Sequence, residues 1–326
     1  MPSFRTGVVT GIRAERDGLQ KVEIDGEPAY VLTQLIGTVA VGDRVVVNTT
    51  AVELGLGTGG WHFVHWNLAR ESWSQSGPGT VMKLRYTSLQ IDTGAAEEGD
   101  AGAMGSELAG RPVVACTLHS QVACVAAAFA RVAPGRRLVY VMTDSAALPL
   151  ALSDMVADLR ERGLVAGTVT CGQAFGGDHE AVSVPSALLV AVHTARAAAV
   201  VVGPGPGVVG TGSRYGFGGV EVAAVVDAAA RLGGRPIVAV RYSDVDPRDR
   251  HRGVSHHTTT ALALAHSRPL VAVPRGSGDE GLGQVLEVEV PADLEHRATS
   301  MGRDPSVDPA FFRWAAAAGV VAALLA

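Results

Sequence analysis

Two stretches of the chain concentrate residues that can bind anions or move protons. The first, residues 199–219, is an apolar run that leads into a loop with eight glycines between Gly203 and Gly219. The second, residues 241–258, holds four arginines, three aspartates and three histidines within eighteen residues. Glycines allow backbone N–H groups to converge on an anion, and histidine exchanges protons near neutral pH. Together the two stretches predict a site for a small anionic ligand.

The glycine loop matches neither of the common nucleotide-binding motifs in full. Gly205, Gly207 and Gly210 have the spacing of a dinucleotide-binding motif, but Pro206 removes a backbone donor, and no acidic residue follows where it would bind a ribose. A P-loop would place its Lys-Ser or Lys-Thr pair directly after Gly212, where Ser213 and Arg214 stand. We therefore expect a more general anion site. The residues expected to form it are Gly205, Gly207, Gly210, Thr211, Gly212, Ser213 and Arg214.

The three histidines of residues 241–258 are candidates for acid–base catalysis. His251 precedes a predicted helix that Ser255 can cap and that opens with His256 and His257. Adjacent helical residues point about 100° apart, so His256 and His257 should not easily bind one ion, and one of them could reach the site while the other packs. The alternative is a loop braced by arginine–aspartate pairs, in which the histidines only stabilise the fold.

Polar residues that directly follow other predicted strands are further candidates. Asp178 and His179 could complete an acid–base or metal-binding cluster with His251. No zinc-type spacing is present, so no metal is assigned. The remaining residues expected to clamp charge or contact the ligand are Arg250, Arg252, His119 and Asp144.

Alternating strands and helices must position these residues. From residue 111 onward six short apolar runs alternate with helical stretches. This pattern predicts an α/β fold with a doubly wound, mostly parallel sheet of about six strands, to which residues 286–290 could add an edge strand. The strand-to-helix turns carry most of the unusual polar residues, whereas the helix-to-strand turns are short and plain. Since ligands bind at the carboxyl ends of such strands, the candidates should lie along one edge of the sheet.

The first 92 residues follow a different pattern. Short β-rich runs are separated by Asp17-Gly18 and Asp25-Gly26, which are typical of hairpins. This spacing predicts a small all-β, barrel-like domain, which a strand over residues 81–92 would close. Residues 93–110 have few large apolar side chains and are expected to form a linker or mobile loop. The Rossmann-like α/β domain then covers residues 111–326 and ends in a helix.

Composition limits the classes of function. The net charge of −5 argues against nucleic-acid binding, although Lys83 and Arg85 beside Tyr86 keep it open for the β domain. Three cysteines without metal spacing favour a reducing, cytoplasmic setting, and no signal-peptide pattern opens the sequence. The uncharged residues 314–326 are too few to cross a bilayer. We expect the terminal helix to pack on the core or on another copy of the chain, so a homo-oligomer is possible.

The chain also resembles a known family. It is similar, in the strings GPGVVGTGSRYGFGG and DPRDRHRGVSHHT, to an uncharacterised bacterial family described as a domain of unknown function and found largely in Gram-positive bacteria. The resemblance extends to WHFVHWNL and MKLRYTSLQ and covers nearly the whole chain. It implies one whole-length protein of cytoplasmic bacterial type, and it brings no activity or catalytic residue with it.

The sequence thus favours an enzyme that binds a small anionic or phosphate-bearing ligand and catalyses hydrolysis or group transfer. No particular cofactor is indicated. Two alternatives stay open: a metal-dependent hydrolase, and a non-catalytic protein that senses a ligand or takes part in assembly.

Overall fold

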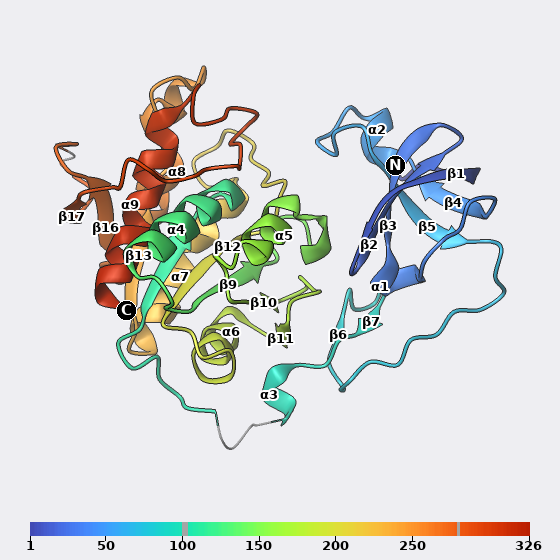
Figure 1. Cartoon of the computed structure of the whole chain (residues 1–326), viewed down its shortest axis with the longest axis horizontal. Helices are drawn as coiled ribbons and strands as arrows, with labels where there is room; N and C mark the ends of the chain where they lie inside the picture. The colour runs from blue at the N-terminus through green and yellow to red at the C-terminus, as the bar shows by residue number, and fades with distance from the viewer. Residues whose placement is uncertain (100–103, 279–280) are drawn as a thin grey trace. The chain divides into compact units, whose positions relative to one another are not determined.

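The computed structural model describes residues 1–99, 104–278 and 281–326. The chain divides into two compact units, Met1–Gly94 and Ala95–Ala326 (Figure 1). Residues 100–103 of the predicted linker or loop lie outside the described residues, and the part before them contains the short helix α3 (Ala96–Gly99).

The first unit is a closed barrel of five strands, as the sequence predicts. Around the barrel the strands are β1 (Phe4–Arg16), β2 (Leu19–Ile24), β3 (Glu27–Leu32), β5 (His62–Asn67) and β4 (Arg44–Asn48). β3 and β5 run parallel, whereas the other neighbours are antiparallel. Inward-facing side chains such as Val22, Ile24 and Val45 form its core.

Short elements complete this unit. Helix α1 (Thr33–Ile36) follows β3, and helix α2 (Thr50–Glu53) follows β4. The expectation of a single strand over residues 81–92 is wrong. Two strands of two residues each, β6 (Met82–Lys83) and β7 (Ile91–Asp92), pair antiparallel there, because Leu84 and Tyr86 have positive φ angles that bend the chain between them.

The second unit is built on a parallel sheet of eight strands. Six of them are the predicted apolar runs: β8 (Pro112–Cys116), β9 (Leu138–Thr143), β10 (Gly167–Cys171), β12 (Ala199–Pro204), β13 (Arg235–Ala239) and β16 (Leu270–Pro274). The edges are β11 (His179–Ala181) and β17 (Gln284–Val288), and the order is β11-β10-β9-β12-β8-β13-β16-β17. All neighbouring pairs are parallel.

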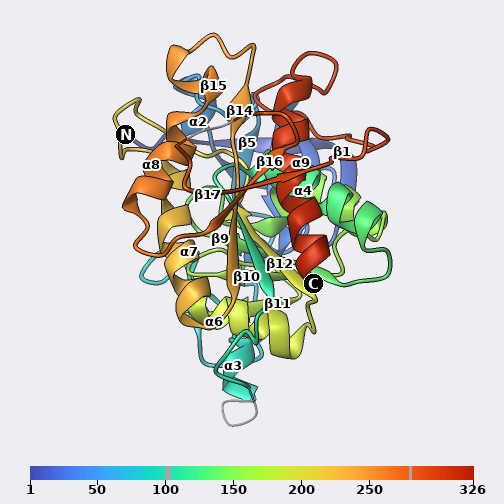
Figure 2. The ribbon, with the colours of Figure 1, turned by 90° about the vertical axis from the view of Figure 1, so that its left-hand side faces the viewer.

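Helices cover both faces of the sheet. One face packs against α4 (His119–Val132), α5 (Asp154–Glu161) and α9 (Pro309–Leu325). The other packs against α6 (Val184–Leu189), α7 (Val222–Arg231) and α8 (His256–Leu264). Figure 2 shows α4 and α9 on one side of the sheet and α7 and α8 on the other. The chain crosses the sheet in one direction through α4 and α5 and returns through α6, α7 and α8, as right-handed crossovers require.

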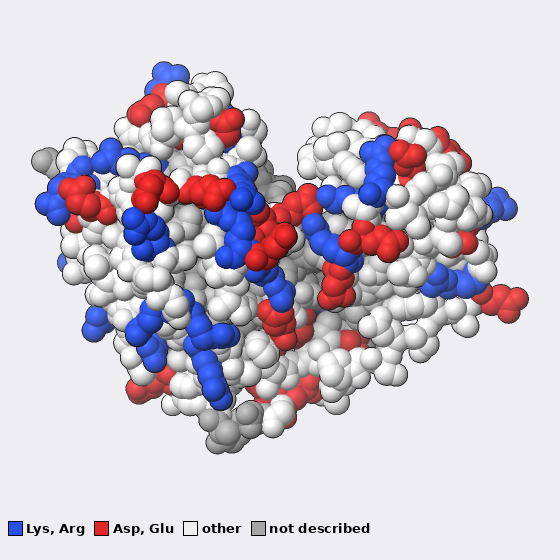
Figure 3. All heavy atoms as spheres, viewed as in Figure 1, with Lys and Arg blue, Asp and Glu red and all other residues white. Residues whose placement is uncertain are grey.

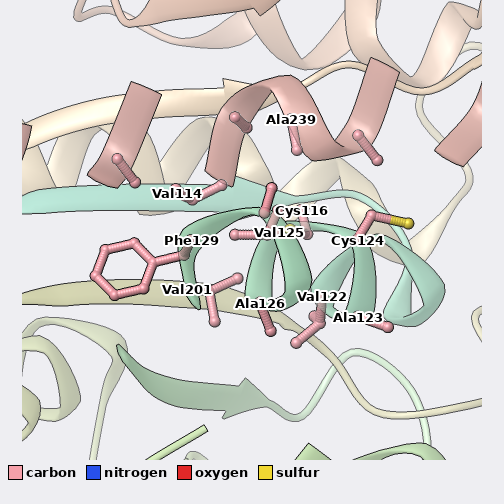
Figure 4. Packing of buried hydrophobic residues seen from close by; sticks show 14 of the residues in the cluster. Val114, Cys116, Val122, Ala123, Cys124, Val125, Ala126, Phe129, Val201 and Ala239 are labelled. Carbon is pink, nitrogen blue, oxygen red and sulfur yellow. The ribbon is translucent and has the colours of Figure 1, made fainter. Parts of the chain in front are cut away.

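Small side chains allow the layers to approach closely. In Figure 4, Val122 and Phe129 of α4 lie among Val114 and Val201 of the sheet. A Cβ atom on Gly319 of α9 would lie 2.2 Å from the carbonyl oxygen of Val125, so α9 crosses α4 at a distance that only glycine permits. The terminal helix therefore packs on the core of its own chain. Across the described residues, the search for a helix with the length and apolarity to cross a bilayer finds none.

The carboxyl ends of β12, β8 and β13 lie where the connections of neighbouring strands leave toward different faces of the sheet. Helix α4 leaves β8 toward one face of the sheet, whereas α7 and α8 leave β12 and β13 toward the other. Where neighbouring connections diverge in this way, a crevice opens at the ends of the strands.

Candidate functional site

Two neighbouring pockets lie past the carboxyl ends of β12, β8 and β13. The small pocket has a volume of about 180 Å³ and the large pocket about 590 Å³. Leu118, Val208 and Met301 line both of them, so the two pockets lie side by side. All lining residues belong to the Ala95–Ala326 unit.

The small pocket joins the two stretches on which the sequence concentrates its polar chemistry. The glycine loop contributes Gly210, Gly212 and Ser213 to the wall. The stretch after β13 contributes Arg241, Arg248, Arg250, His251, His256 and His257.

A two-stranded pair brings the histidines together. β14 (Tyr242–Ser243) pairs antiparallel with β15 (Gly253–Val254), which returns the chain to the start of α8. The ring of His251 thereby lies 5.0 Å from that of His256 and 4.8 Å from that of His257, measured between centroids. One nitrogen of each ring lies within 4.8 Å of the others.

Both helical histidines line the small pocket, so the expectation that one of them would pack away from the site is wrong. His256 and His257 are the first two residues of α8. No helical turn precedes these two residues, so both rings have room to lie over the N-terminal end of α8. Their centroids lie 4.5 Å apart.

Arg241 determines which nitrogen of His257 carries the proton. Its Nη1 donates to Nδ1 of His257 over 2.9 Å. A guanidinium group has no acceptor, so Nδ1 holds the lone pair and Nε2 carries the hydrogen. The ring is also stacked on Phe217, with 3.8 Å between centroids and 3° between planes. His257 is therefore a fixed, neutral hydrogen-bond donor.

All three histidines favour the neutral state. Burial and then the charge of Arg241 lower the pKa of His257 to about 2 and that of His251 to about 3. Burial and then Arg250 lower the pKa of His256. Burial also lowers the pKa of Arg241, to about 10, which leaves its guanidinium charged at neutral pH. The pocket thus combines neutral imidazoles with positive charge.

The arginines share a buried carboxylate that does not balance them. Oδ2 of Asp246 lies 2.8 Å from Arg248, 3.1 Å from Arg303 and 3.8 Å from Arg241. Burial opposes ionisation of Asp246, but hydrogen bonds from Arg248 and nearby positive charge hold its pKa well below the usual value. Asp308 pairs with Arg303 at 3.2 Å. In this described cluster the guanidinium groups outnumber the carboxylates, so the small pocket is positive.

The glycine loop has a different form from a helix-capping anion cradle. Gly210 and Phe217 form an isolated antiparallel bridge, and Thr211 and Ser213 bond to each other through their hydroxyls over 2.9 Å. The loop is therefore a small hairpin whose polar groups largely satisfy one another. It therefore forms one wall of the pocket, and its backbone N–H groups do not converge on an anion as expected.

Several candidate residues of this loop do not line the small pocket. Gly207 lines the large pocket. Gly205 is a packing position, because a Cβ atom there would lie 2.3 Å from the carbonyl oxygen of Ala147. The guanidinium of Arg214 lies over the ring of Tyr215, 5.1 Å from its centroid. Gly205, Thr211 and Arg214 are not among the residues that line the two pockets.

Asp178 and His179 do not join the histidine cluster. They lie beside and within β11, at the edge of the sheet five strands away from β13, which is roughly 24 Å at the usual strand spacing. Asp178 instead pairs with Arg160 at 2.6 Å and accepts from the backbone N–H of Thr168. The expected cluster with His251 is wrong, because the chain turns back after β10 to form this edge strand.

Two other candidates also lie outside both pockets. Asp144 accepts a hydrogen bond from the backbone N–H of Gln173 over 2.8 Å and so ties the end of β9 to the turn after β10. Arg252 is exposed and does not line either pocket, in contrast to Arg250.

His119 borders the large pocket and is held in one tautomer. Its Nδ1 lies 2.9 Å from the carbonyl oxygen of Pro204 and its Nε2 lies 2.7 Å from Oγ of Ser153. A carbonyl only accepts, so Nδ1 donates and Nε2 accepts from the hydroxyl. Burial lowers the pKa of His119 to about 4. The ring is therefore neutral and already hydrogen-bonded on both sides.

Comparison with known proteins places the chain in a family. Residues 28–291 match the family described as "Protein of unknown function (DUF3866)". The chain belongs to the DUF3866 family. A search of curated proteins and a search of solved structures find no match. Membership confirms the resemblance to a domain of unknown function.

A transition metal fits the spacing of the three histidines better than it fits their surroundings. Histidines that bind a metal usually donate the other ring N–H to an oxygen acceptor. His251 can do so toward Oγ of Ser255, 2.6 Å away. Nδ1 of His257 faces a guanidinium donor instead, and the neighbouring arginines repel a cation. The donor set of the DUF3866 site therefore suits an anion.

Sequence reasoning missed the two charged residues Arg241 and Arg248 of the small pocket, and also its apolar lining residues, as site candidates. Arg241 stands two residues past β13, the kind of position that marks His119 and Asp144 as candidates. Arg248 pairs in a bidentate way with Asp246, two residues before it, and this pairing in the sequence does not indicate that the side chain also lines a pocket.

Proposed function

We propose that this protein binds a small phosphate-bearing or other anionic ligand in the small pocket. The observation that carries the proposal is the hydrogen bond from Arg241 to His257, which makes the imidazole a neutral donor beside a positive charge. Arg248 and Arg250 extend the positive wall. Guanidinium groups and N–H donors together are the usual partners of phosphate oxygens.

The reaction class that this arrangement suits is hydrolysis or group transfer at the anionic group. Arginines stabilise negative charge that develops on transferred oxygens. A bound dianion raises the pKa of neighbouring imidazoles, so His251 or His256 would gain proton affinity only when the ligand is present. Acid–base catalysis would then be coupled to binding.

Titration calorimetry with inorganic phosphate tests the binding proposal. We expect Arg250→Met to weaken phosphate binding at least tenfold, since a hydrogen bond to a charged group contributes about 1.5–3 kcal/mol. Arg252→Met is the matched control, because Arg252 is an equally charged, exposed neighbour outside the pocket. It should leave the affinity near that of the unaltered protein. Absence of phosphate binding, or equal losses in both variants, would overturn the proposal.

Zinc titration distinguishes the metal-dependent alternative. If the site holds a metal, Zn²⁺ should bind the unaltered protein, His257→Ala should abolish this binding, and Arg250→Met should strengthen it by removing a repulsive charge. We expect no such pattern, because Nδ1 of His257 is occupied by Arg241.

A further inference from the structure

The large pocket has the size of a small-molecule site and is open beside the anion site. Its volume of about 590 Å³ lies within the roughly 300–1,000 Å³ typical of ligand pockets. Its wall is built from the start of α4, from α5, from the beginning of the glycine loop and from residues 295–301, which follow β17.

The ion pairs at this pocket neutralise one another. Arg162 lies 3.1 Å from Asp158 and 3.2 Å from Glu295. Arg297 lies 3.2 Å from the same Asp158 and 2.8 Å from the same Glu295. Each arginine thus pairs with both carboxylates in a closed ring, so these four side chains present no unbalanced charge to a ligand.

Apart from the exposed carboxylate of Asp154, the remaining polar groups of the wall are imidazoles and hydroxyls. Both ring nitrogens of His119 have partners, and the hydroxyls of Ser120 and Ser300 bond to each other over 3.1 Å. Burial and then Arg162 lower the pKa of His296, which favours its neutral form. Most of the rest of the wall is apolar and includes Leu118, Ala123, Met155, Leu159, Ala298 and Met301.

We infer that the ligand is an organic phosphate or similar anion whose uncharged, largely apolar body occupies the large pocket while its anionic group occupies the small one. The shared wall of Leu118, Val208 and Met301 places the two parts next to each other. Charge is thus recognised in one pocket and apolar surface in the other. This inference rests on the proposed function and adds the chemical class of the ligand to it.

Titration of the full chain with three probes tests the inference. The probes are inorganic phosphate, ribose 5-phosphate with a polar body, and 1-naphthyl phosphate with an apolar body. We expect 1-naphthyl phosphate to bind at least about tenfold more tightly than the other two, because only its body removes apolar surface from water in the large pocket.

Filling the large pocket should remove this preference alone. Ala298→Phe is expected to reduce the affinity for 1-naphthyl phosphate to that for phosphate, and to leave phosphate affinity within about twofold. The matched control is Ala292→Phe, at an exposed alanine in the same connecting segment outside the pocket wall. Retained phosphate binding shows that the Ala298→Phe variant is folded. If that variant does not fold, Met155→Trp provides a second obstruction of the same pocket, from α5.

The outcomes separate the two proposals. If phosphate binds but 1-naphthyl phosphate binds no more tightly, or if neither obstruction lowers its affinity, the inference is overturned and the anion site stands. If ribose 5-phosphate binds most tightly, the body of the ligand is polar and the inference is again overturned. If the unaltered protein binds none of the probes, the proposed function is overturned, and the inference with it.

Discussion

His119 lies between a carbonyl group and a hydroxyl group, and its neutral ring donates to the first and accepts from the second. Protonation would place a second N–H against the hydroxyl of Ser153, which would have to turn away. This hydroxyl also accepts from the backbone N–H of Val156 at the start of α5. Protonation of this ring would thus reverse its hydrogen bond to the serine that caps α5.

The pKa of His119 predicts how stability depends on pH. It is about 4 in the folded protein and about 6.5 in the unfolded chain. Between these values the unfolded chain binds the proton and the folded protein does not, so the free energy of unfolding falls as the pH falls from 6.5 to 4. His119→Gln should reduce this slope by up to about 1.4 kcal/mol per pH unit, and solvent in the adjoining pocket makes the measured change smaller.

Urea denaturation at a series of pH values measures this slope. His266→Gln, at an exposed position on the surface, is the control. Equal slopes in the two variants would contradict the role assigned to His119, whereas a uniform loss of stability in His119→Gln at every pH would reflect lost packing alone.

The sequence predicts which residues line the site only where neighbouring residues in the chain determine their position. Gly210, Ser213 and Arg250 are predicted candidates and do line the small pocket. The contact between Arg241 and His257 is not predictable, because it depends on β14 and β15, whose two residues each are too short to give a periodic pattern. The proton states of the histidines follow from that contact.

Ser255 links an element to the site. Its hydroxyl oxygen accepts from the backbone N–H of His257 as the N-cap of α8 and also contacts Nδ1 of His251. Ser183 caps α6 in a comparable way, by accepting from the backbone N–H of Ser186, but it is exposed and lies outside both pockets. A comparison of variants at the two serines therefore distinguishes the loss of a helix cap from the loss of a contact in the pocket.

We expect Ser255→Ala and Ser183→Ala each to lower the free energy of unfolding by about 1 kcal/mol through the lost cap. Only Ser255→Ala should also weaken phosphate binding, because it releases His251. Chemical denaturation and calorimetry measure the two quantities. If Ser255→Ala retained full phosphate affinity, His251 would not need to be oriented for binding.

Elements are predicted well where their apolar runs are long. The central strands of the sheet are buried on both faces and give continuous apolar runs. The edges give weaker patterns: β11 has three residues, and three of the five residues of β17 are exposed. Because β11 is too short to predict, the sequence places Asp178 and His179 at the site, whereas the structure places them at an edge strand, five strands away from β13.

Charge is mixed over the surface of the whole molecule. Figure 3 shows basic and acidic side chains interspersed on the visible face of each unit. An extended field of one sign, which attracts a polyanion, is therefore missing from this face. The positive charge on which the proposed ligand binding depends is instead concentrated at the small pocket, as expected for a site that recognises a small anion.

The division of the chain into units leads to a last prediction. The family match begins at residue 28, within the barrel, and ends at residue 291, before the segment that closes both pockets. All pocket residues, together with Asp246 and Arg303 behind them, nevertheless belong to Ala95–Ala326, which has hydrophobic clusters of its own. The proposed anion site is thus assigned to the residues of this one unit.

A fragment of residues 95–326 should therefore bind inorganic phosphate with an affinity within about threefold of the full chain. Calorimetry measures the affinity, and cooperative thermal unfolding verifies that the fragment is folded. The Arg250→Met change should weaken binding in the fragment as it does in the full chain, since the same guanidinium lines the same pocket. A folded fragment that does not bind phosphate would mean that the barrel supplies part of the anion site, which contradicts the assignment of the pocket to one unit.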